Sequence, residues 1–370
     1  MTASGRAVHG GNLVQVAAEY GVEAASLVDF SANINPRGLP LGARLRLQRD
    51  AADAGLLAAY PDPGFTELRG ALAQRLGIAP DCMVVGAGAE ALIGSVLATV
   101  APARCLVPIP AFSEYARACS AAQAKLETVG LDPASDFHLD GKAFLRKLRG
   151  ARYDCVILNN PHNPSGALLE AGELMELVEQ ARASGAFVLV DEAFIDYAPH
   201  ASVIREAVRQ SRVAVVRSLT KFYGCPALRV GYVAGSAETM AKVARVVPTW
   251  PVTVLSANAL REAIEDEEYA TVSLRENEVE RRRLAESLAQ LGAQVFPSAA
   301  NFLLLRLQRG WPDSRSLRES LIRNHHIVIR NCDSYSGLEA GRFIRVAVRS
   351  AAENAQLLRA LKETLKESWR

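Results

Sequence analysis

The sequence lacks the features that mark several large classes of protein. None of its apolar stretches approaches the roughly 18 residues that a helix needs to cross a bilayer. The chain does not open with a basic segment followed by an apolar run, as a secretory signal would. Its formal net charge is only +2, and it contains no internal repeat or low-complexity segment. We therefore expect a cytoplasmic protein with neither a nucleic acid nor a membrane as its partner.

Cysteine is also scarce, and its placement excludes two further kinds of site. No two cysteines form a C-x-x-C pair, and none has the spacing of metal ligands. We expect buried thiols in a reducing compartment, without disulfides and without a metal centre. The residues concerned are Cys82, Cys105, Cys119, Cys155, Cys225 and Cys332.

What the chain does contain is an alternation of short apolar strands and helices. Strands are predicted at 83–85, 105–109, 154–158, 186–190 and 213–216, with helices between them. This alternation favours an α/β fold whose mostly parallel sheet is covered on both faces. Beyond residue 250 the pattern changes to one long helix over 256–291, strands at 301–307, 326–330 and 343–348, and helices at 314–324 and from 353. That order predicts a smaller α+β domain.

At 370 residues the chain has room for about two domains. We expect residues 1–40 to form an N-terminal arm that is part of the small domain. Residues 41–250 would form the large domain, and 251–370 the small C-terminal domain.

Unusual residues follow the ends of the predicted parallel strands. They are Gly88, Phe112, Asn163, Asp191 and Lys221. Ligands of such sheets bind outside the carboxyl ends of the strands. Turn chemistry could explain each residue singly, but their convergence predicts a ligand site.

The stretch from 213 to 232 joins a strand to a possible phosphate site. Ser218 and Thr220 offer hydroxyls, Lys221 an amine, and Arg229 a permanent cation. Lysines form Schiff bases with carbonyl cofactors, and pyridoxal phosphate carries both an aldehyde and a phosphate. Taken alone, the stretch equally fits a solvated lysine at the end of a strand.

Two glycine-bearing segments allow a second interpretation each. The turn at 86–90 can bind a phosphate through its backbone N–H groups. The alternative is the glycine motif of a dinucleotide-binding fold, but this sequence lacks the third glycine of that motif. His9, Gly10 and Gly11 precede Asn12, which we expect to cap a helix over 13–20. That start could receive an anion, although a plain surface helix is favoured by the residues alone.

Three motifs, in order, resemble those of the class I/II aminotransferase superfamily, the fold-type I enzymes that use pyridoxal phosphate. They read S-L-T-K-F-Y-G-C-P-A-L-R-V-G-Y, N-N-P-H-N-P-S-G and D-E-A-F. The segments H-G-G-N, D-F-S-A-N-I-N-P-R-G, Y-P-D-P-G-F-T-E-L-R and I-V-I-R-N-C-D-S-Y-S-G-L are similar to those of the histidinol-phosphate aminotransferase branch. Within that branch the sequence is most similar to the threonine-phosphate decarboxylases of cobalamin biosynthesis.

The resemblance implies a role for each residue of the cofactor site. Lys221 would attach to the cofactor's aldehyde and later transfer protons, and Asp191 would pair with the pyridine nitrogen. Asn163 would bind the ring oxygen, a task that relatives share with a tyrosine at the position of Phe194 here. Phe112 would stack on the ring. The phosphate would be held by the turn at Gly88, the backbone of Ala89 and Glu90, and the side chains of Ser218 and Arg229.

The resemblance also implies a substrate site and a partner subunit. Arg345 and Arg330 would bind anionic groups of a small phosphorylated amino acid, and His9 and Asn33 would complete the pocket. Tyr60 matches a family tyrosine that reaches the phosphate of the neighbouring subunit, so a homodimer is expected.

Decarboxylation and transamination begin from the same bound state, so the catalytic residues alone do not separate the two reactions. A catalytically silent protein that keeps the fold for binding or assembly is a third alternative. The intact set of Lys221, Asp191, Asn163 and Arg229 argues against it.

Overall fold

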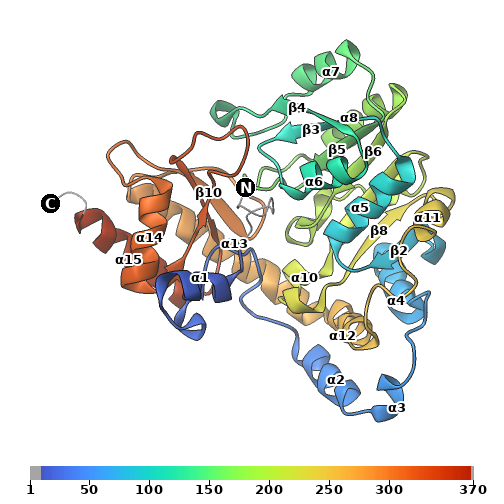
Figure 1. Ribbon diagram of the computed structural model, residues 1–370, viewed down its shortest axis with the longest axis horizontal. Helices are drawn as coiled ribbons and strands as arrows, with labels where there is room; N and C mark the ends of the chain where they lie inside the picture. The colour runs from blue at the N-terminus through green and yellow to red at the C-terminus, as the bar shows by residue number, and fades with distance from the viewer. Residues whose placement is uncertain (1–9, 368–370) are drawn as a thin grey trace.

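A seven-stranded sheet forms the centre of the larger part of the molecule in the computed structural model, which describes residues 10–367 (Figure 1). The strand order is β2-β8-β7-β6-β5-β3-β4, and only β8 runs antiparallel to its neighbours. The predicted mostly parallel sheet is therefore confirmed. Its strands are β2 (Met83–Gly86), β3 (Arg104–Ile109), β4 (Lys125–Gly130), β5 (Cys155–Asn159), β6 (Phe187–Asp191), β7 (Val213–Ser218) and β8 (Gly231–Gly235).

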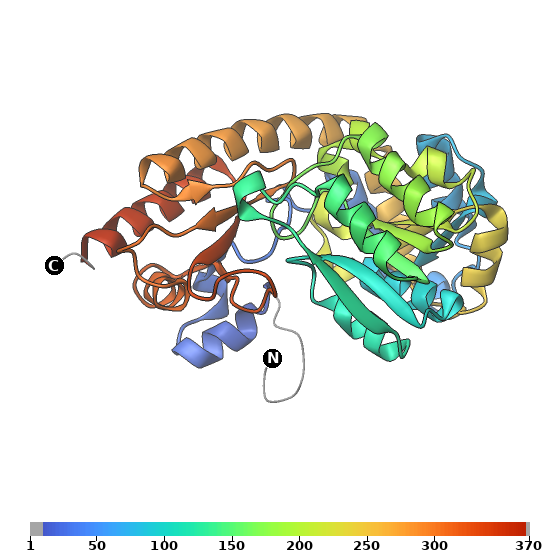
Figure 2. The same cartoon turned by 90° about the horizontal axis from the view of Figure 1, so that it is seen from above.

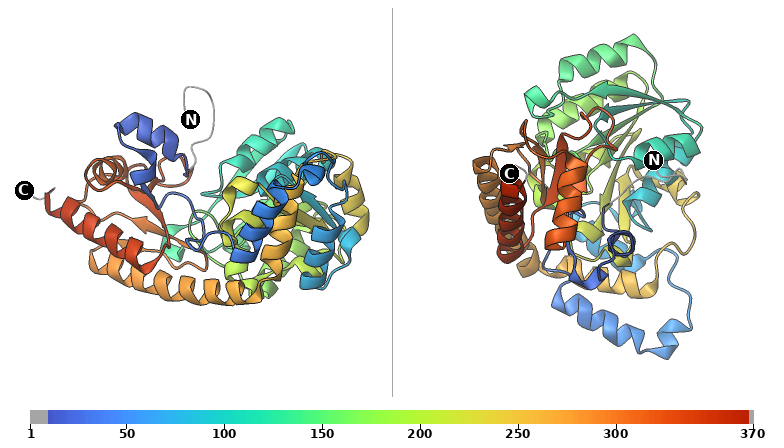
Figure 3. Two further views of the ribbon diagram at one scale, coloured as in Figure 1. Left: turned by 90° about the horizontal axis from the view of Figure 1, so that it is seen from below. Right: turned by 60° about the vertical axis from the view of Figure 1, so that its left-hand side comes forward.

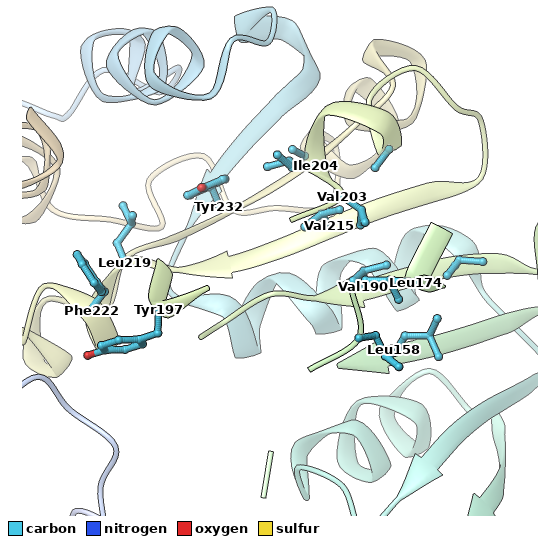
Figure 4. Packing of buried hydrophobic residues seen from close by; sticks show 14 of the residues in the cluster. Leu158, Leu174, Val190, Tyr197, Val203, Ile204, Val215, Leu219, Phe222 and Tyr232 are labelled. Carbon is cyan, nitrogen blue, oxygen red and sulfur yellow. The ribbon is translucent and has the colours of Figure 1, made fainter. Parts of the chain in front are cut away.

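The central strands are apolar along their whole length because both faces of the sheet are covered. Alternate side chains enter different cores: Leu158, Val190 and Val215 belong to one, whereas their neighbours Ile157 and Leu189 belong to the other. Figure 4 shows the first core, in which Leu158, Val190 and Val215 lie close to Leu174, Val203 and Ile204.

Helices pack on each face of the sheet. The first face is covered by α4 (Thr66–Leu76), α7 (Gly141–Gly150), α8 (Ala171–Ala183), α9 (Ile204–Ala207) and α12 (Val254–Glu265). The second face is covered by α5 (Ala89–Val100), α6 (Glu114–Ala121) and α11 (Ala237–Ala244). The fold is thus a three-layer α/β arrangement, as predicted.

The smaller part is built around an antiparallel sheet with the order β12-β13-β10-β9. These strands are β9 (Gln294–Val295), β10 (Phe302–Arg306), β12 (Arg330–Asn331) and β13 (Phe343–Ala347). Its core includes side chains of α13, α14 (Ser314–His325) and α15 (Ala351–Glu367). Figure 1 shows this part on the left, separate from the large sheet.

The single helix predicted over 256–291 is wrong, because the chain breaks at Asp266. Asp266 has φ −80° and ψ 85°, ends α12, and caps the following α13 (Glu267–Gln290) by accepting a hydrogen bond from the Tyr269 N–H at 2.8 Å. In Figure 2, α13 runs along the top of the molecule from one part to the other. Figure 3 shows α12 beside α2 (Leu41–Ala51), on which it packs.

The single strand predicted over 326–330 is also wrong. His326 has a left-handed backbone with φ 57° that ends α14, and two short strands follow it. The first, β11 (Ile327–Val328), pairs in parallel with β1 (Val28–Asp29), whereas β12 joins the antiparallel sheet. This change of partner brings Arg330 to the edge of the small sheet that faces the large one.

The N-terminal segment spans both parts of the molecule. The helix α1 (Leu13–Tyr20) has the predicted bounds and its expected cap, since Asn12 accepts a hydrogen bond from the Gln15 N–H at 3.2 Å. It packs on Ile322 and Val328 of the small part, whereas α2 lies against α12 of the large part and α3 (Ala54–Leu57) packs on α2. Because α12 shares the large core, we place the boundary between the two domains within α13 rather than at residue 250, as a proposal.

Two further features concern the whole described chain. All six cysteines are free thiols, and five of them are buried. None of the helices within residues 10–367 combines the length and apolar character needed to cross a membrane.

Candidate active site

A cavity of about 260 Å³ lies between the carboxyl ends of β5, β6 and β7 and the small sheet. It brings together residues that are far apart in the sequence, from the N-terminal loop to β13. Most of the predicted site residues line it: Asn33, Ala89, Glu90, Phe112, Asn163, Asp191, Ser218, Lys221, Arg229, Arg330 and Arg345. Three do not: Gly88 directly precedes the lining residues Ala89 and Glu90, Tyr60 lies elsewhere, and His9 lies outside the described residues.

Asp191 ends β6 with its carboxylate buried and hydrogen-bonded on both oxygens. The Tyr115 hydroxyl donates to Oδ2 at 2.5 Å, and the Ala193 N–H donates to Oδ1 at 2.9 Å. Burial raises the pKa of Asp191 to about 6, while the Tyr115 hydrogen bond opposes that rise. A buried carboxylate facing a cavity is suited to bind a cationic N–H group of a ligand.

Lys221 lies on the short helix α10 (Leu219–Phe222), which begins where β7 ends. Burial, together with the positive charges of Arg229 and Arg345, lowers the pKa of its amine to about 8. A lowered pKa leaves a larger share of the amine neutral near physiological pH, which is the nucleophilic form.

One end of the cavity has the groups of an anion site. Gly88 caps α5 with φ +86°, so the N–H groups of Ala89 and Glu90 open the helix. The positive φ favours glycine at this position, and a Cβ added there would lie 2.9 Å from a guanidinium nitrogen of Arg229, so this cation lies close against the turn. Ser218 and Thr220 face each other with their hydroxyl oxygens 2.9 Å apart.

Asn163 is fixed by a chain of hydrogen bonds from the neighbouring strands. Its N–H donates to Asn159 Oδ1 at 2.7 Å, and Asn159 Nδ2 donates to the Asp191 carbonyl at 2.8 Å. Arg345 Nη1 donates to Asn163 Oδ1 at 2.6 Å. Because the amide oxygen is occupied, the Asn163 group left to face a ligand is its NH2 donor.

Two buried arginines enter the cavity from the small sheet. Arg330 on β12 and Arg345 on β13 are register partners, and each side chain is only 6% exposed. Arg345 Nη2 donates to the Ser31 carbonyl at 3.1 Å, but its Nε has no hydrogen-bond partner within the described chain. The same holds for the buried Asn33 Oδ1. Beside a cavity, the Arg345 Nε–H donor is suited to an anionic group of a ligand, whereas the Asn33 Oδ1 acceptor is suited to a ligand N–H or O–H group.

The N-terminal segment closes against this site. A Cβ on Gly10 would lie 2.2 Å from the Ser31 carbonyl oxygen, so the close approach of the two loops requires glycine here. The Gly11 N–H donates to Ser31 Oγ at 3.0 Å, and Asp29 Oδ1 accepts from the same hydroxyl at 2.6 Å. The start of α1 therefore lies beside the cavity.

Sequence reasoning missed several residues that hold the site together. Tyr115 lies three residues after Phe112 in the sequence, and only the folding of the chain brings its hydroxyl to Asp191. No local pattern therefore marked it as a site residue. His162 is buried and neutral, since burial lowers its pKa to about 4. Its Nε2 donates to the Pro110 carbonyl at 2.8 Å, and its Nδ1 lies 2.7 Å from Ser165 Oγ, so it ties the Asn163 loop to the Phe112 loop. Its only signal was its place within the asparagine motif.

Tyr60 lies away from this cavity, on the surface. Its side chain is 79% exposed and stacks on Trp250 with ring centroids 4.3 Å apart. Within one chain it therefore does not contact the site.

The donor set fits pyridoxal phosphate. Asp191 provides the buried carboxylate for a ring nitrogen, Lys221 the amine for an aldehyde, and the Gly88 turn with Ser218 and Arg229 the seat for a phosphate. The fit rests on the cavity itself, because the glycine turn, the amine and the buried carboxylate all border it.

Comparisons with known proteins agree with this geometry. The family model of aminotransferase class I and II matches residues 25–362. The chain is 35% identical to the threonine-phosphate decarboxylase of Salmonella typhimurium, covering 96% of both chains. It is 32% identical to the histidinol-phosphate aminotransferase of Methylibium petroleiphilum, covering 91% of this chain and 89% of that one.

The fold is similar to that of the histidinol-phosphate aminotransferase of Sinorhizobium meliloti in complex with pyridoxal-5'-phosphate. The TM-score is 0.87 at 22% identity, covering 99% of this chain and 98% of that one. The chain therefore belongs to the aminotransferase class I and II family of enzymes, and its cofactor is pyridoxal 5'-phosphate.

Proposed function

We propose that this enzyme decarboxylates L-threonine O-3-phosphate to (R)-1-amino-2-propanol O-2-phosphate in cobalamin biosynthesis. The observation that carries the proposal is the pair of buried arginines, Arg330 and Arg345, on adjacent strands at one cavity. Threonine phosphate is small and carries two anionic groups, a carboxylate and a phosphate. Histidinol phosphate has one anionic group and an imidazole ring that needs more room. The similarity to the Salmonella threonine-phosphate decarboxylase supports the same choice.

We assign the cofactor contacts as follows. Asp191 would hold the protonated ring nitrogen, Asn163 the ring oxygen and Phe112 the ring face. Backbone N–H groups of Ala89 and Glu90, with Ser218 and Arg229, would hold the phosphate. Phe194 is buried and has no hydroxyl, so the ring oxygen depends on the Asn163 NH2 group and on Lys221.

When bound, the cofactor accepts into its ring the electrons of the bond that breaks at the substrate's Cα. The protein's own contribution is orientation. Arg345, held by Asn163 and by the Ser31 carbonyl, and Arg330 together fix two anionic groups of the substrate. We propose that this fixation places the Cα–carboxylate bond perpendicular to the ring, so that this bond breaks rather than the Cα–H bond.

Lys221 then completes the reaction. The Cα–carboxylate bond breaks, CO2 leaves without the bonding electron pair, and a proton from the Lys221 ammonium takes the place of the carboxylate on Cα. Its pKa of about 8 lets the amine both hold and give up that proton near neutral pH.

The test is to incubate the enzyme with threonine phosphate and to measure CO2 and the amino-alcohol phosphate together. We expect equal amounts of both with threonine phosphate and far less of either with threonine, which lacks one anionic group. Lys221→Ala serves as the matched inactive control. Transamination with 2-oxoglutarate and no release of CO2 would instead make the enzyme a histidinol-phosphate-type aminotransferase.

The same assignments argue for catalysis rather than a silent binding role. Asp191 and Arg345 are buried charges that cost stability, and their placement at one cavity is best explained by chemistry. We also propose that the enzyme acts as a homodimer, in which Tyr60 of one chain completes the site of the other.

A further inference from the structure

An acidic side chain, Glu90, lies at the end of the cavity where we propose that the phosphate binds. A negative charge is unexpected there, because a phosphate site favours positive groups. Glu90 is the second residue of α5, and its backbone N–H belongs to the proposed phosphate seat. A carboxylate in the first turn of a helix is itself attracted to the positive end of the helix. It therefore competes there with the phosphate dianion and repels it.

Arg117 of the neighbouring helix α6 holds this carboxylate. Its Nη2 donates to Glu90 Oε1, and its Nε donates to Glu114 Oε2. Glu114 is 4% exposed and Arg117 is exposed, so the guanidinium is held from its inner side by α6 and turned toward α5. The Arg117 guanidinium thus joins Glu114 on α6 to Glu90 on α5.

The same contact joins the two segments that enclose the cofactor. Helix α5 begins at the phosphate seat, and α6 begins directly after the loop that carries Phe112. The charge of Glu90 is felt inside the cavity, because it raises the pKa of Lys221 against the effect of burial. Glu90 is therefore close enough for its own neutralisation to matter to the bound anion.

We propose that Arg117 is a positioning residue for cofactor retention: it draws the Glu90 carboxylate away from the phosphate and neutralises it. The inference holds for either reaction of this family, so it does not depend on the decarboxylase assignment.

The experiment measures the Kd of pyridoxal phosphate, by titrating the full-length chain after its cofactor has been removed. Arg117→Ala is expected to weaken binding by about tenfold at low salt, because Glu90 then faces the phosphate unneutralised. The loss should shrink as ionic strength rises, since salt screens that repulsion. Arg117→Lys should retain most of the affinity. The double variant Arg117→Ala/Glu90→Gln should recover most of it, because the repelling charge is gone.

Two controls make the result specific. Arg323 forms an exposed pair with Glu319 on α14, so Arg323→Ala removes a comparable cation away from the cavity and should leave the Kd unchanged. Tenfold tighter binding in Glu90→Gln alone would overturn the proposal even if Arg117→Ala failed to fold, because it would show that the Glu90 carboxylate still acts on the phosphate while Arg117 is present. An unchanged Kd in Arg117→Ala, a loss that does not depend on salt, or a loss that Glu90→Gln fails to rescue would also overturn it.

Discussion

The two ionisable groups nearest the proposed chemistry have pKa values displaced by burial in opposite directions. The pKa of Asp191 is raised to about 6, and the pKa of Lys221 is lowered to about 8. In each case burial disfavours the charged form, and the neighbours modify its effect. The Tyr115 hydroxyl favours the Asp191 carboxylate, whereas Arg229 and Arg345 disfavour the Lys221 ammonium. The direction in which a substitution of each neighbour shifts these two pKa values can therefore be predicted.

Tyr115→Phe should weaken cofactor binding most strongly at low pH. The change removes the 2.5 Å hydrogen bond to Asp191 Oδ2 and so raises the Asp191 pKa above 6. At pH 6 the variant would hold less of the carboxylate that binds the ring nitrogen, and we expect a loss of about tenfold in affinity. At pH 8 the carboxylate is ionised in both proteins, so the loss should be smaller. Cofactor titration at both pH values measures this; an equal loss at both would contradict the argument.

Arg345→Met should move the pH dependence of cofactor attachment upward. Attachment needs the neutral Lys221 amine, so in the native chain its rate should rise through a pH of about 8. Removing the cation at 345 raises the Lys221 pKa, and the midpoint of the rise should shift above 8. The rate of absorbance change on adding cofactor to the cofactor-free chain, recorded against pH, measures the midpoint. Arg318→Met, which removes a cation that contacts Tyr20, should leave it in place.

At the scale of elements, a buried ion pair fixes the ends of the two strands that lead into the proposed catalytic groups. Glu192 follows Asp191 on β6, Arg217 precedes Ser218 on β7, and their side chains lie 2.7 Å apart. Glu192 is fully buried, and its Oε1 also accepts from the Val203 N–H at 2.8 Å. The pair therefore sets the relative position of Asp191 and Ser218.

Arg217→Met should destabilise the protein strongly because it leaves the Glu192 charge buried without its partner. We expect the free energy of unfolding to fall by about 3–5 kcal/mol. Adding Glu192→Gln should cost less than a second loss of that size, since the buried Glu192 charge is then removed as well. Urea unfolding followed by circular dichroism measures both variants. Lys242→Met breaks an exposed pair with Glu238 and should change stability far less than Arg217→Met does.

Elements whose signal is local were predictable from the sequence, and those fixed by pairing partners were not. Helix α1 has both of its capping residues, Asn12 and Gly21, in the sequence, and its bounds were predicted correctly. The break at Asp266 has a capping residue too, but helical periodicity continues on both sides of it, so the pattern reads as one helix. The change of sheet between Val328 and Arg330 leaves no local trace, because it depends on β1 and β13.

The candidate site divides in the same way. Lys221, Asp191 and Asn163 follow strand ends, and parallel strands carry such residues to one edge of the sheet. The contact between Tyr115 and Asp191 spans 76 positions, and that between Arg345 and Asn163 spans 182. Such contacts depend on how helix α6 and the small sheet pack, which the sequence pattern does not specify.

At the scale of the whole molecule, the exposed apolar side chains gather in two neighbouring segments. Within residues 10–367 and apart from Val14, the large apolar residues that are exposed lie at 41–60 and 246–250: Leu41, Leu45, Leu57, Tyr60, Val246 and Trp250. The two segments meet, because Tyr60 stacks on Trp250 and Trp250 Nε1 donates to the Pro61 carbonyl at 3.1 Å. Apolar surface gathered in this way marks an interface, which the proposed homodimer would cover.

A mixing experiment tests whether Tyr60 serves the partner's site. Lys221→Ala and Tyr60→Ala should each reduce activity strongly when they are prepared alone. In a two-fold symmetric dimer formed from one chain of each, one site combines the intact Lys221 of the Tyr60→Ala chain with the intact Tyr60 of its partner. Random exchange makes half of the dimers mixed, so the mixture should regain about one quarter of the native activity.

Unmixed samples, and a mixture of Lys221→Ala with Asp191→Ala, serve as controls, because Lys221 and Asp191 both line the cavity of their own chain. In that pair each mixed dimer holds one site without Lys221 and one without Asp191, so no intact site forms and activity should stay low. If Tyr60 instead served its own chain's site, mixing it with Lys221→Ala would likewise regain nothing. Recovery confined to the Tyr60→Ala mixture therefore requires a tyrosine that crosses between subunits, which its exposed position outside the cavity of its own chain makes physically reasonable.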